Sequence, residues 1–132
     1  MILQNPRKYG VPPFNIVVVH GGPGACGEMA PVARGLSSDF GVLEPLQTAT
    51  MIDGQVKELE EAIKTHGSPP VVLVGHSWGA WLAFIFAAKN PSLVRKLVLV
   101  GSGPFEERYA SEIMPARLSR LPETSATNLP CS

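Results

Sequence analysis

Ten consecutive residues constrain the fold of this chain more than any other segment. Residues 71–80 read Val-Val-Leu-Val-Gly-His-Ser-Trp-Gly-Ala, and an apolar segment continues to Lys89. The apolar run predicts a buried strand and the following segment predicts a helix, so Ser77 falls at the turn between them. Such a turn strains its central residue and leaves no room for a Cβ at Gly75 or Gly79. The pattern is typical of a nucleophile elbow, which makes Ser77 a candidate nucleophile at the carboxyl end of a strand.

Strands and helices alternate along the rest of the chain. We expect strands over 14–20, 41–46, 71–74 and 97–100, and helices over 28–36, 53–66 and 78–89. This order predicts an α/β fold, a three-layer sandwich with a mostly parallel central sheet and right-handed crossovers. The short β-branched strands predict burial on both faces, that of 97–100 included. The helix over 78–89 is apolar nearly all round, which predicts that other elements cover it, and Asp53 is the expected N-cap of the helix over 53–66.

The length of 132 residues suits one domain with a real core. We expect an irregular N-terminal segment over 1–13 and the α/β core over 14–104. Residues 105–132 begin with loosely helical spacing and end in a proline-containing tail without periodicity, which predicts an irregular C-terminal segment.

A glycine-rich loop follows the first strand and reads His20-Gly21-Gly22-Pro23-Gly24. Backbone N–H groups of such a loop can stabilise a developing oxyanion. Pro23 has no N–H, so we assign the oxyanion hole to the N–H groups of Gly22 and Trp78, with His20 bracing the loop through a hydrogen bond. A plain tight turn or a phosphate cradle are the alternatives, but no Gly-Lys-Ser/Thr follows, which excludes the nucleotide P-loop.

Together the two motifs resemble the α/β-hydrolase fold superfamily, and within it the proline iminopeptidase-like branch, over residues 14–105. The resemblance implies a serine hydrolase that acts on a small ester or amide through an acyl-enzyme at Ser77. It implies that the four strands lie side by side, with the elbow strand near the middle, and that residues 105–120 begin a helical cap. Epoxide hydrolase and dehalogenase chemistry fits less well, because those relatives use an acidic nucleophile. The loop and elbow residues expected to support the site are His20, Gly21, Gly24, Gly75, His76 and Gly79.

The rest of the catalytic triad is missing from the sequence. In this superfamily an acid and then a histidine follow the serine, but neither Asp nor His occurs after Ser77. Glu106 and Glu107 are weak candidates for the cleft, and the side chain of His76 is expected to point away into the fold. A serine without a positioned base is a weak nucleophile, so we expect impaired catalysis. We expect a truncated or frameshifted product or a fragment, with an intentionally short protein as the alternative.

A non-catalytic interpretation therefore stays open. A hydrolase-like remnant would bind a ligand or self-associate, because missing outer strands leave sheet edges unpaired and apolar surface exposed.

Composition limits the partners. Eleven basic residues balance eleven acidic ones, which argues against nucleic-acid and anionic membrane binding. Cys26 and Cys131 are too few for a disulfide scaffold and lack metal-site spacing. The N-terminus has no signal-peptide pattern, and the longest apolar stretch, 78–88, is too short to span a bilayer. We expect a cytoplasmic protein with a small-molecule substrate and neither metal nor cofactor.

Overall fold

Five strands form one sheet in the computed structural model, which describes residues 4–22 and 25–102. The strands are β1 (Arg7–Tyr9), β2 (Phe14–Val19), β3 (Gly41–Glu44), β4 (Val71–His76) and β5 (Val94–Val100). The helices are α1 (Ala30–Leu36), α2 (Ile52–His66) and α3 (Trp78–Lys89), followed by the 3-10 turn η1 (Pro91–Leu93). The strand order is β1-β3-β2-β4-β5, parallel from β3 to β5, with β1 antiparallel to β3. The predicted side-by-side order of the four parallel strands is confirmed, and the elbow strand β4 lies between β2 and β5.

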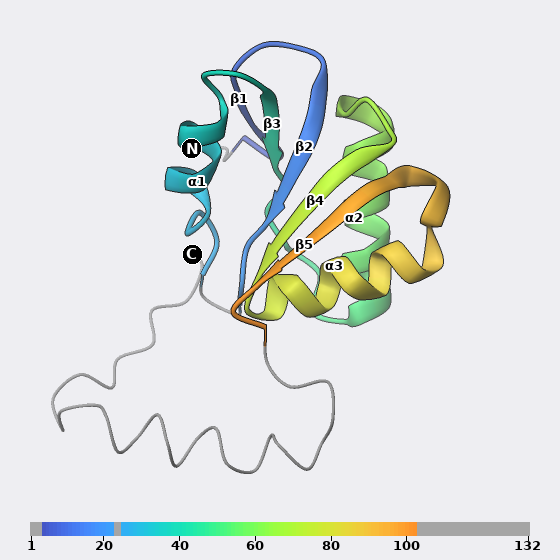
Figure 1. Ribbon diagram of the computed structural model, residues 1–132. Helices are drawn as coiled ribbons and strands as arrows, with labels where there is room; N and C mark the ends of the chain where they lie inside the picture. Colours follow the sequence, from blue (N-terminus) through green and yellow to red (C-terminus); the bar gives the residue numbers. More distant parts are fainter. Residues whose placement is uncertain (1–3, 23–24, 103–132) are drawn as a thin grey trace, which may run out of the picture.

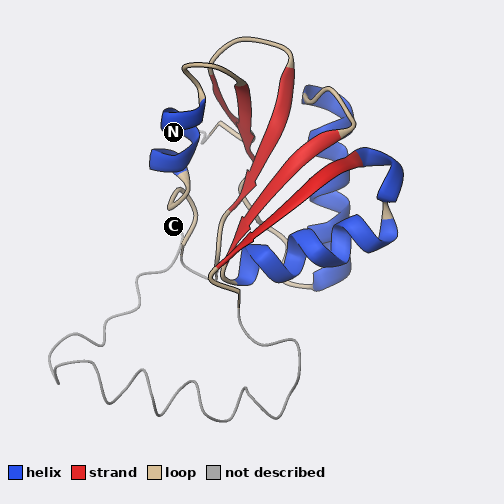
Figure 2. Cartoon of the chain, in the orientation of Figure 1, coloured by secondary structure: helices blue, strands red, loops and turns tan. Residues whose placement is uncertain are grey.

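Helices cover both faces of this sheet (Figures 1 and 2). Alternate residues of β2 point to opposite faces, as the period of a strand requires. Ile16 and Val18 pack with Met29 and Ala33 on the α1 side. The larger core lies on the other side, where the sheet packs against α2 and α3 through Val17, Val19, Leu43, Val56, Leu59, Ile63, Val71, Leu73, Leu82, Ala83 and Phe86. The predicted three-layer α/β fold is confirmed.

The N-terminal segment contains a strand that the sequence did not predict. β1 lies within residues 1–13, which were expected to be irregular, and Arg7 pairs with Glu44 in register. The Tyr9 hydroxyl donates to Glu44 Oε1 at 2.8 Å, and Arg7 Nη1 lies 3.9 Å from the same oxygen. Desolvation raises the pKa of Tyr9, and the adjacent Glu44 carboxylate raises it further. β1 is three residues long and has no apolar periodicity, so only its partner strand identifies it.

The last strand differs from the prediction of a buried strand over 97–100. β5 begins at Val94, and none of its side chains is fully buried. Val98 and Val100 are 37% and 46% exposed. β5 is the edge strand of the described sheet, and Figure 1 places α1 over the opposite part of the sheet. Its α1-side face is therefore uncovered by any described helix.

The helices agree with the predicted ranges to within two residues. α1 begins at Ala30 and carries Pro31 in its first turn, where a missing N–H costs no hydrogen bond. α2 begins at Ile52 with Met51 as its N-cap, so the prediction of Asp53 as the cap is wrong: Asp53 lies within the first turn.

α3 is not covered all round, contrary to the prediction. It buries Leu82, Ala83 and Phe86 against the sheet and α2, whereas Phe84 on its outer side is 47% exposed.

Candidate functional site

Ser77 occupies the tight turn between β4 and α3. Its backbone has φ +56° and ψ −121°, and among the described residues no other non-glycine residue has a positive φ. The Ser77 N–H donates to the carbonyl of Val100 at 3.1 Å, and the Ser77 carbonyl accepts from the N–H of Ala80 at 3.0 Å. Backbone bonds on both sides therefore hold the unusual conformation that the sequence pattern predicts.

The two elbow glycines face backbone atoms at close range. A Cβ on Gly75 would lie 2.8 Å from the Cα of Ala80 and would also overlap the backbone of Gly79. A Cβ on Gly79 would lie 2.5 Å from the carbonyl oxygen of His20. The start of α3 thus packs directly on the end of β2, which only residues without side chains allow.

The glycine-rich loop lies beside the elbow. A Cβ added to Gly21 would lie 3.2 Å from Ser77 Cβ, and a Cβ added to Gly22 would lie 4.0 Å from the Trp78 ring. The structure therefore brings together the two motifs that the sequence placed more than fifty residues apart. Gly24, also named as a supporting residue, lies outside the described residues.

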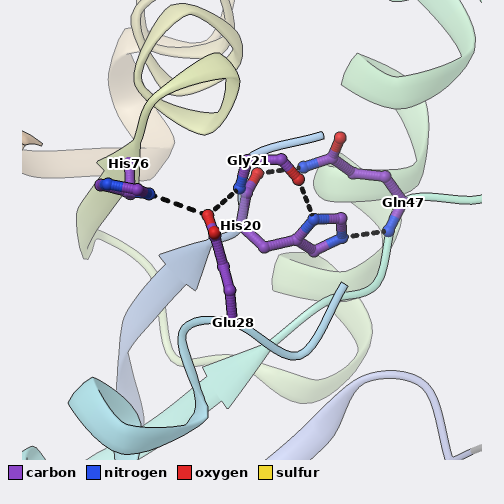
Figure 3. A network of polar contacts seen from close by, with 5 residues as sticks. All are labelled: His20, Gly21, Glu28, Gln47 and His76. Carbon is purple, nitrogen blue, oxygen red and sulfur yellow. Dashed lines mark hydrogen bonds and ion pairs between the residues drawn. The ribbon is translucent and has the colours of Figure 1, made fainter. Parts of the chain in front are cut away.

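His20 braces this loop. Its side chain is 2% exposed; Nε2 accepts from the Gln47 N–H at 3.0 Å, and Nδ1 contacts the Gly21 carbonyl, so Nδ1 carries the proton (Figure 3). The Gln47 amide group donates to the His20 carbonyl at 2.7 Å. The predicted hydrogen bond of His20 to the loop is present. Gln47, which follows β3, was missed, because no local pattern identifies a residue that acts across strands.

Glu28 joins the loop to the elbow. Its Oε1 accepts from the Gly21 N–H at 2.6 Å and lies 2.8 Å from His76 Nδ1 (Figure 3). The expectation that His76 points into the fold is wrong: its side chain is 41% exposed and turns toward Glu28 on the α1 side. The sequence placed Glu28 at a helix start and gave no sign of this contact.

The pKa of Glu28 reflects these contacts. Partial burial raises the pKa of the carboxyl, but the hydrogen bonds from His76 and from the Gly21 N–H lower it by more, so the net shift is downward. Glu28 is therefore held as a carboxylate beside the glycine-rich loop.

Trp78 opens α3 directly after the nucleophile candidate. The first N–H groups of a helix have no partner within it and carry its positive dipole end. The Trp78 indole donates to Gln55 Oε1 at 3.0 Å and packs edge-on against Trp81 at 5.9 Å. These contacts tie the start of α3 to α2.

Comparison with known proteins identifies the family. The sequence model of the family described as "alpha/beta hydrolase fold" matches residues 15–129. This chain belongs to the α/β hydrolase family.

Individual relatives agree with this assignment. Proline iminopeptidase of Saccharolobus solfataricus is 32% identical, over 86% of this α/β hydrolase chain and 41% of that protein. Phytyl ester synthase 2 of Arabidopsis thaliana is 32% identical, over 64% of this chain and 13% of that protein. The chain thus spans less than half of the length of these curated relatives. The predicted resemblance to the family, with a proline iminopeptidase relative, is confirmed.

Solved structures show the same fold. E-2-(acetamidomethylene)succinate hydrolase superposes with a TM-score of 0.67 at 26% identity, over 86% of this chain and 46% of that one. A marine microorganism esterase superposes with a TM-score of 0.65 at 22% identity, over 89% and 51%. The epoxide hydrolase CorEH has a TM-score of 0.67 at 24% identity, over 82% and 44%.

No described histidine is placed as a base for Ser77 in this α/β hydrolase. The hydrogen bonds of His20 and His76 go to Gln47, Gly21 and Glu28, and none in the described ranges reaches the Ser77 hydroxyl. His66 ends α2. Glu106 and Glu107 lie outside the described residues.

Residues 4–22 and 25–102 contain no group of three or more His, Cys, Asp or Glu side chains suited to a metal ion. No helix in this part of the chain has both the length and the apolar content of a membrane span.

Proposed function

We propose that Ser77 is the nucleophile of a serine hydrolase that acts on a small ester or amide. The observation that carries this proposal is the position of Ser77: a strained elbow at the carboxyl end of β4, beside the glycine-rich loop, where a Cβ added to Gly21 would lie 3.2 Å from Ser77 Cβ. Strain of this kind is concentrated at functional positions, where it exposes the reacting group.

The reaction would proceed through an acyl-enzyme. Ser77 Oγ attacks the substrate carbonyl carbon, and a C–O bond forms as the carbonyl electron pair moves onto oxygen. The N–H groups of Gly22 and Trp78 donate to this oxyanion. When the carbonyl re-forms, the bond to the alcohol or amine breaks, and the leaving group takes up the proton that Ser77 gave to the base. Water then attacks the acyl-enzyme by the same route, which releases the acid and returns a proton to Ser77 Oγ.

The attack by Ser77 also requires the loss of its hydroxyl proton. This proton must pass to a base, and the described histidines are engaged elsewhere. We propose that the base comes from outside the described residues; without one, the proton passes to water and only the residual rate of an oxyanion hole is expected.

The substrate class rests on relatives and on the nucleophile. Proline iminopeptidase, at 32% identity, carries a peptidase name, and E-2-(acetamidomethylene)succinate hydrolase, at 26% identity, carries a hydrolase name. The likeness to epoxide hydrolases, at 24% identity or less, extends to the fold alone. A hydroxyl at the elbow, rather than a carboxylate, favours acyl transfer.

A fluorophosphonate probe tests the nucleophile, because it phosphonylates an activated serine. We expect the wild type to be labelled on the peptide that contains Ser77, and Ser77→Ala to remain unlabelled. Ser68→Ala is the matched control: it removes the same hydroxyl at an exposed site before β4, so labelling should persist. Equal labelling of Ser77→Ala and wild type would refute the proposal.

The edge strand favours a second candidate function, a non-catalytic remnant that self-associates. β5 exposes Val98, Leu99 and Val100, and no strand in the described part of the chain pairs with its outer edge, so that edge can pair with a second copy. Sedimentation velocity at several concentrations tests this: a concentration-dependent dimer supports it, and a monomer at all concentrations excludes it.

A further inference from the structure

Glu28 lies where the glycine-rich loop, the segment before α1 and the end of β4 meet. The same oxygen, Oε1, accepts from the Gly21 N–H at 2.6 Å and lies 2.8 Å from His76 Nδ1. The acyl-transfer steps at Ser77 require neither contact. The Glu28 side chain, before α1, thus bridges Gly21, seven positions earlier in the chain, and His76, 48 positions later and next to Ser77.

The carboxylate and Ser77 flank the same residue. The position of a Cβ on Gly21 lies 2.8 Å from Glu28 Oε1 and 3.2 Å from Ser77 Cβ. Any rotation of the Gly21 backbone therefore alters the approach to Ser77. Glycine permits such rotation more readily than any other residue, so the loop needs external restraints.

Two successive peptide planes of the loop are restrained. The His20–Gly21 peptide is held at both ends, by Glu28 on its N–H and by Gln47 on its carbonyl. The Gly21–Gly22 peptide is held through its carbonyl by the His20 ring. Because a trans peptide is planar, the Gly22 N–H points opposite to that carbonyl. The restraints thus fix the direction of the Gly22 N–H.

We propose that Glu28 is a positioning residue for the oxyanion hole: its carboxylate anchors the Gly21 N–H, so that the Gly22 N–H is aimed at the carbonyl attacked by Ser77. This inference rests on the proposed function. Glu28 acts through the loop backbone and does not contact the substrate.

Substitutions at Glu28 separate geometry from charge. Glu28→Gln keeps an oxygen acceptor for the Gly21 N–H and removes the charge, whereas Glu28→Ala removes the acceptor. Glu60→Ala is the matched control, because Glu60 forms an exposed ion pair with Lys64 on α2. Circular dichroism establishes that each variant is folded.

The first measurement is the kinetics of fluorophosphonate labelling, resolved into the inactivation rate and the probe affinity. Removing one oxyanion donor costs about 100–1000-fold in rate, so misdirecting one should slow the inactivation rate of Glu28→Ala by about 10-fold or more. Probe affinity should not change, and Glu28→Gln and Glu60→Ala should stay within about 3-fold of wild type. An unchanged inactivation rate in Glu28→Ala, or a change confined to affinity, would overturn the inference.

The second measurement, hydrogen exchange at the Gly21 amide followed by NMR, does not depend on activity. Exchange should be slow in wild type and in Glu28→Gln, and about 10-fold faster in Glu28→Ala, while core amides of β2 and β4 remain unchanged. Unchanged exchange at Gly21 would overturn the inference whatever the labelling result. Failure of the wild type to label refutes the proposed function, and faster Gly21 exchange in Glu28→Ala would then still support the anchoring.

Discussion

The contact between α3 and β2 makes Gly79→Ala a decisive substitution. The added methyl group would lie 2.5 Å from the His20 carbonyl oxygen, and the Val19 carbonyl is also in its way. Both obstacles are backbone atoms at the end of a buried strand, so no side-chain rotation relieves the overlap. Either α3 or β2 must shift.

The size of the effect follows from two opposing contributions. Overpacking of this kind costs about 3 kcal/mol at the upper end of its usual range. Alanine is preferred over glycine within a helix by about 1 kcal/mol. We therefore expect Gly79→Ala to lower the free energy of unfolding by about 2 kcal/mol.

Gly35→Ala is the matched control. Gly35 lies in α1, and a Cβ there would meet nothing within 4 Å. Only the preference of helices for alanine over glycine then acts, so the free energy of unfolding of this variant should rise by up to about 1 kcal/mol.

Urea unfolding followed by circular dichroism measures both variants. With a denaturant slope of about 2 kcal/mol per molar, the Gly79→Ala midpoint should fall by about 1 M at unchanged slope. A Gly79→Ala midpoint at or above that of the wild type, together with the expected gain in Gly35→Ala, would refute the close packing of the elbow on β2.

Two further predictions concern the polar network. Because the pKa of Glu28 is lowered in the folded state, its contribution to stability is present above the ordinary value of 4.5 and is lost as the pH falls through the folded pKa. The free energy of unfolding of the wild type, relative to that of Glu28→Gln, should therefore decrease as the pH falls from ~5 to ~3. Urea midpoints measure this difference. A difference that stays constant with pH would contradict the pairing of Glu28 with His76 and the Gly21 N–H. His20→Ala leaves the Gln47 N–H and the Gly21 carbonyl without their partner and should cost about 2 kcal/mol in the same assay, whereas His66→Ala at the end of α2 should change stability by less than about 0.5 kcal/mol. Equal losses in the two histidine variants would contradict the bracing role of His20.

Features encoded by neighbouring residues were predictable. The β-branched run before His20 and the run before Gly75 form strands, because their side chains suit burial on both faces. The elbow was predictable to the residue, since Gly75 and Gly79 leave few other conformations for the turn around Ser77.

Predictions that depended on neighbours in space were less accurate. β5 was expected to be buried because it is apolar, but burial requires partners on its open edge and on its α1-side face. Asp53 was expected to cap α2, but the helix extends one residue further, to Ile52. In both cases the predicted strand or helix is present, but the surrounding structure decides how far its side chains are buried or where it begins.

The sequence by itself determined the alternation of strands and helices, the elbow at Ser77 and the glycine-rich loop, because each depends on residues close together in the chain. Only the tertiary structure decided that β1 joins β3, that Gln47 and Glu28 restrain the loop, and that His76 turns toward Glu28. These contacts join residues from seven to forty-eight positions apart. Such pairs carry no periodicity or turn signal, so they exist only once the parallel strands bring their carboxyl ends to one edge of the sheet.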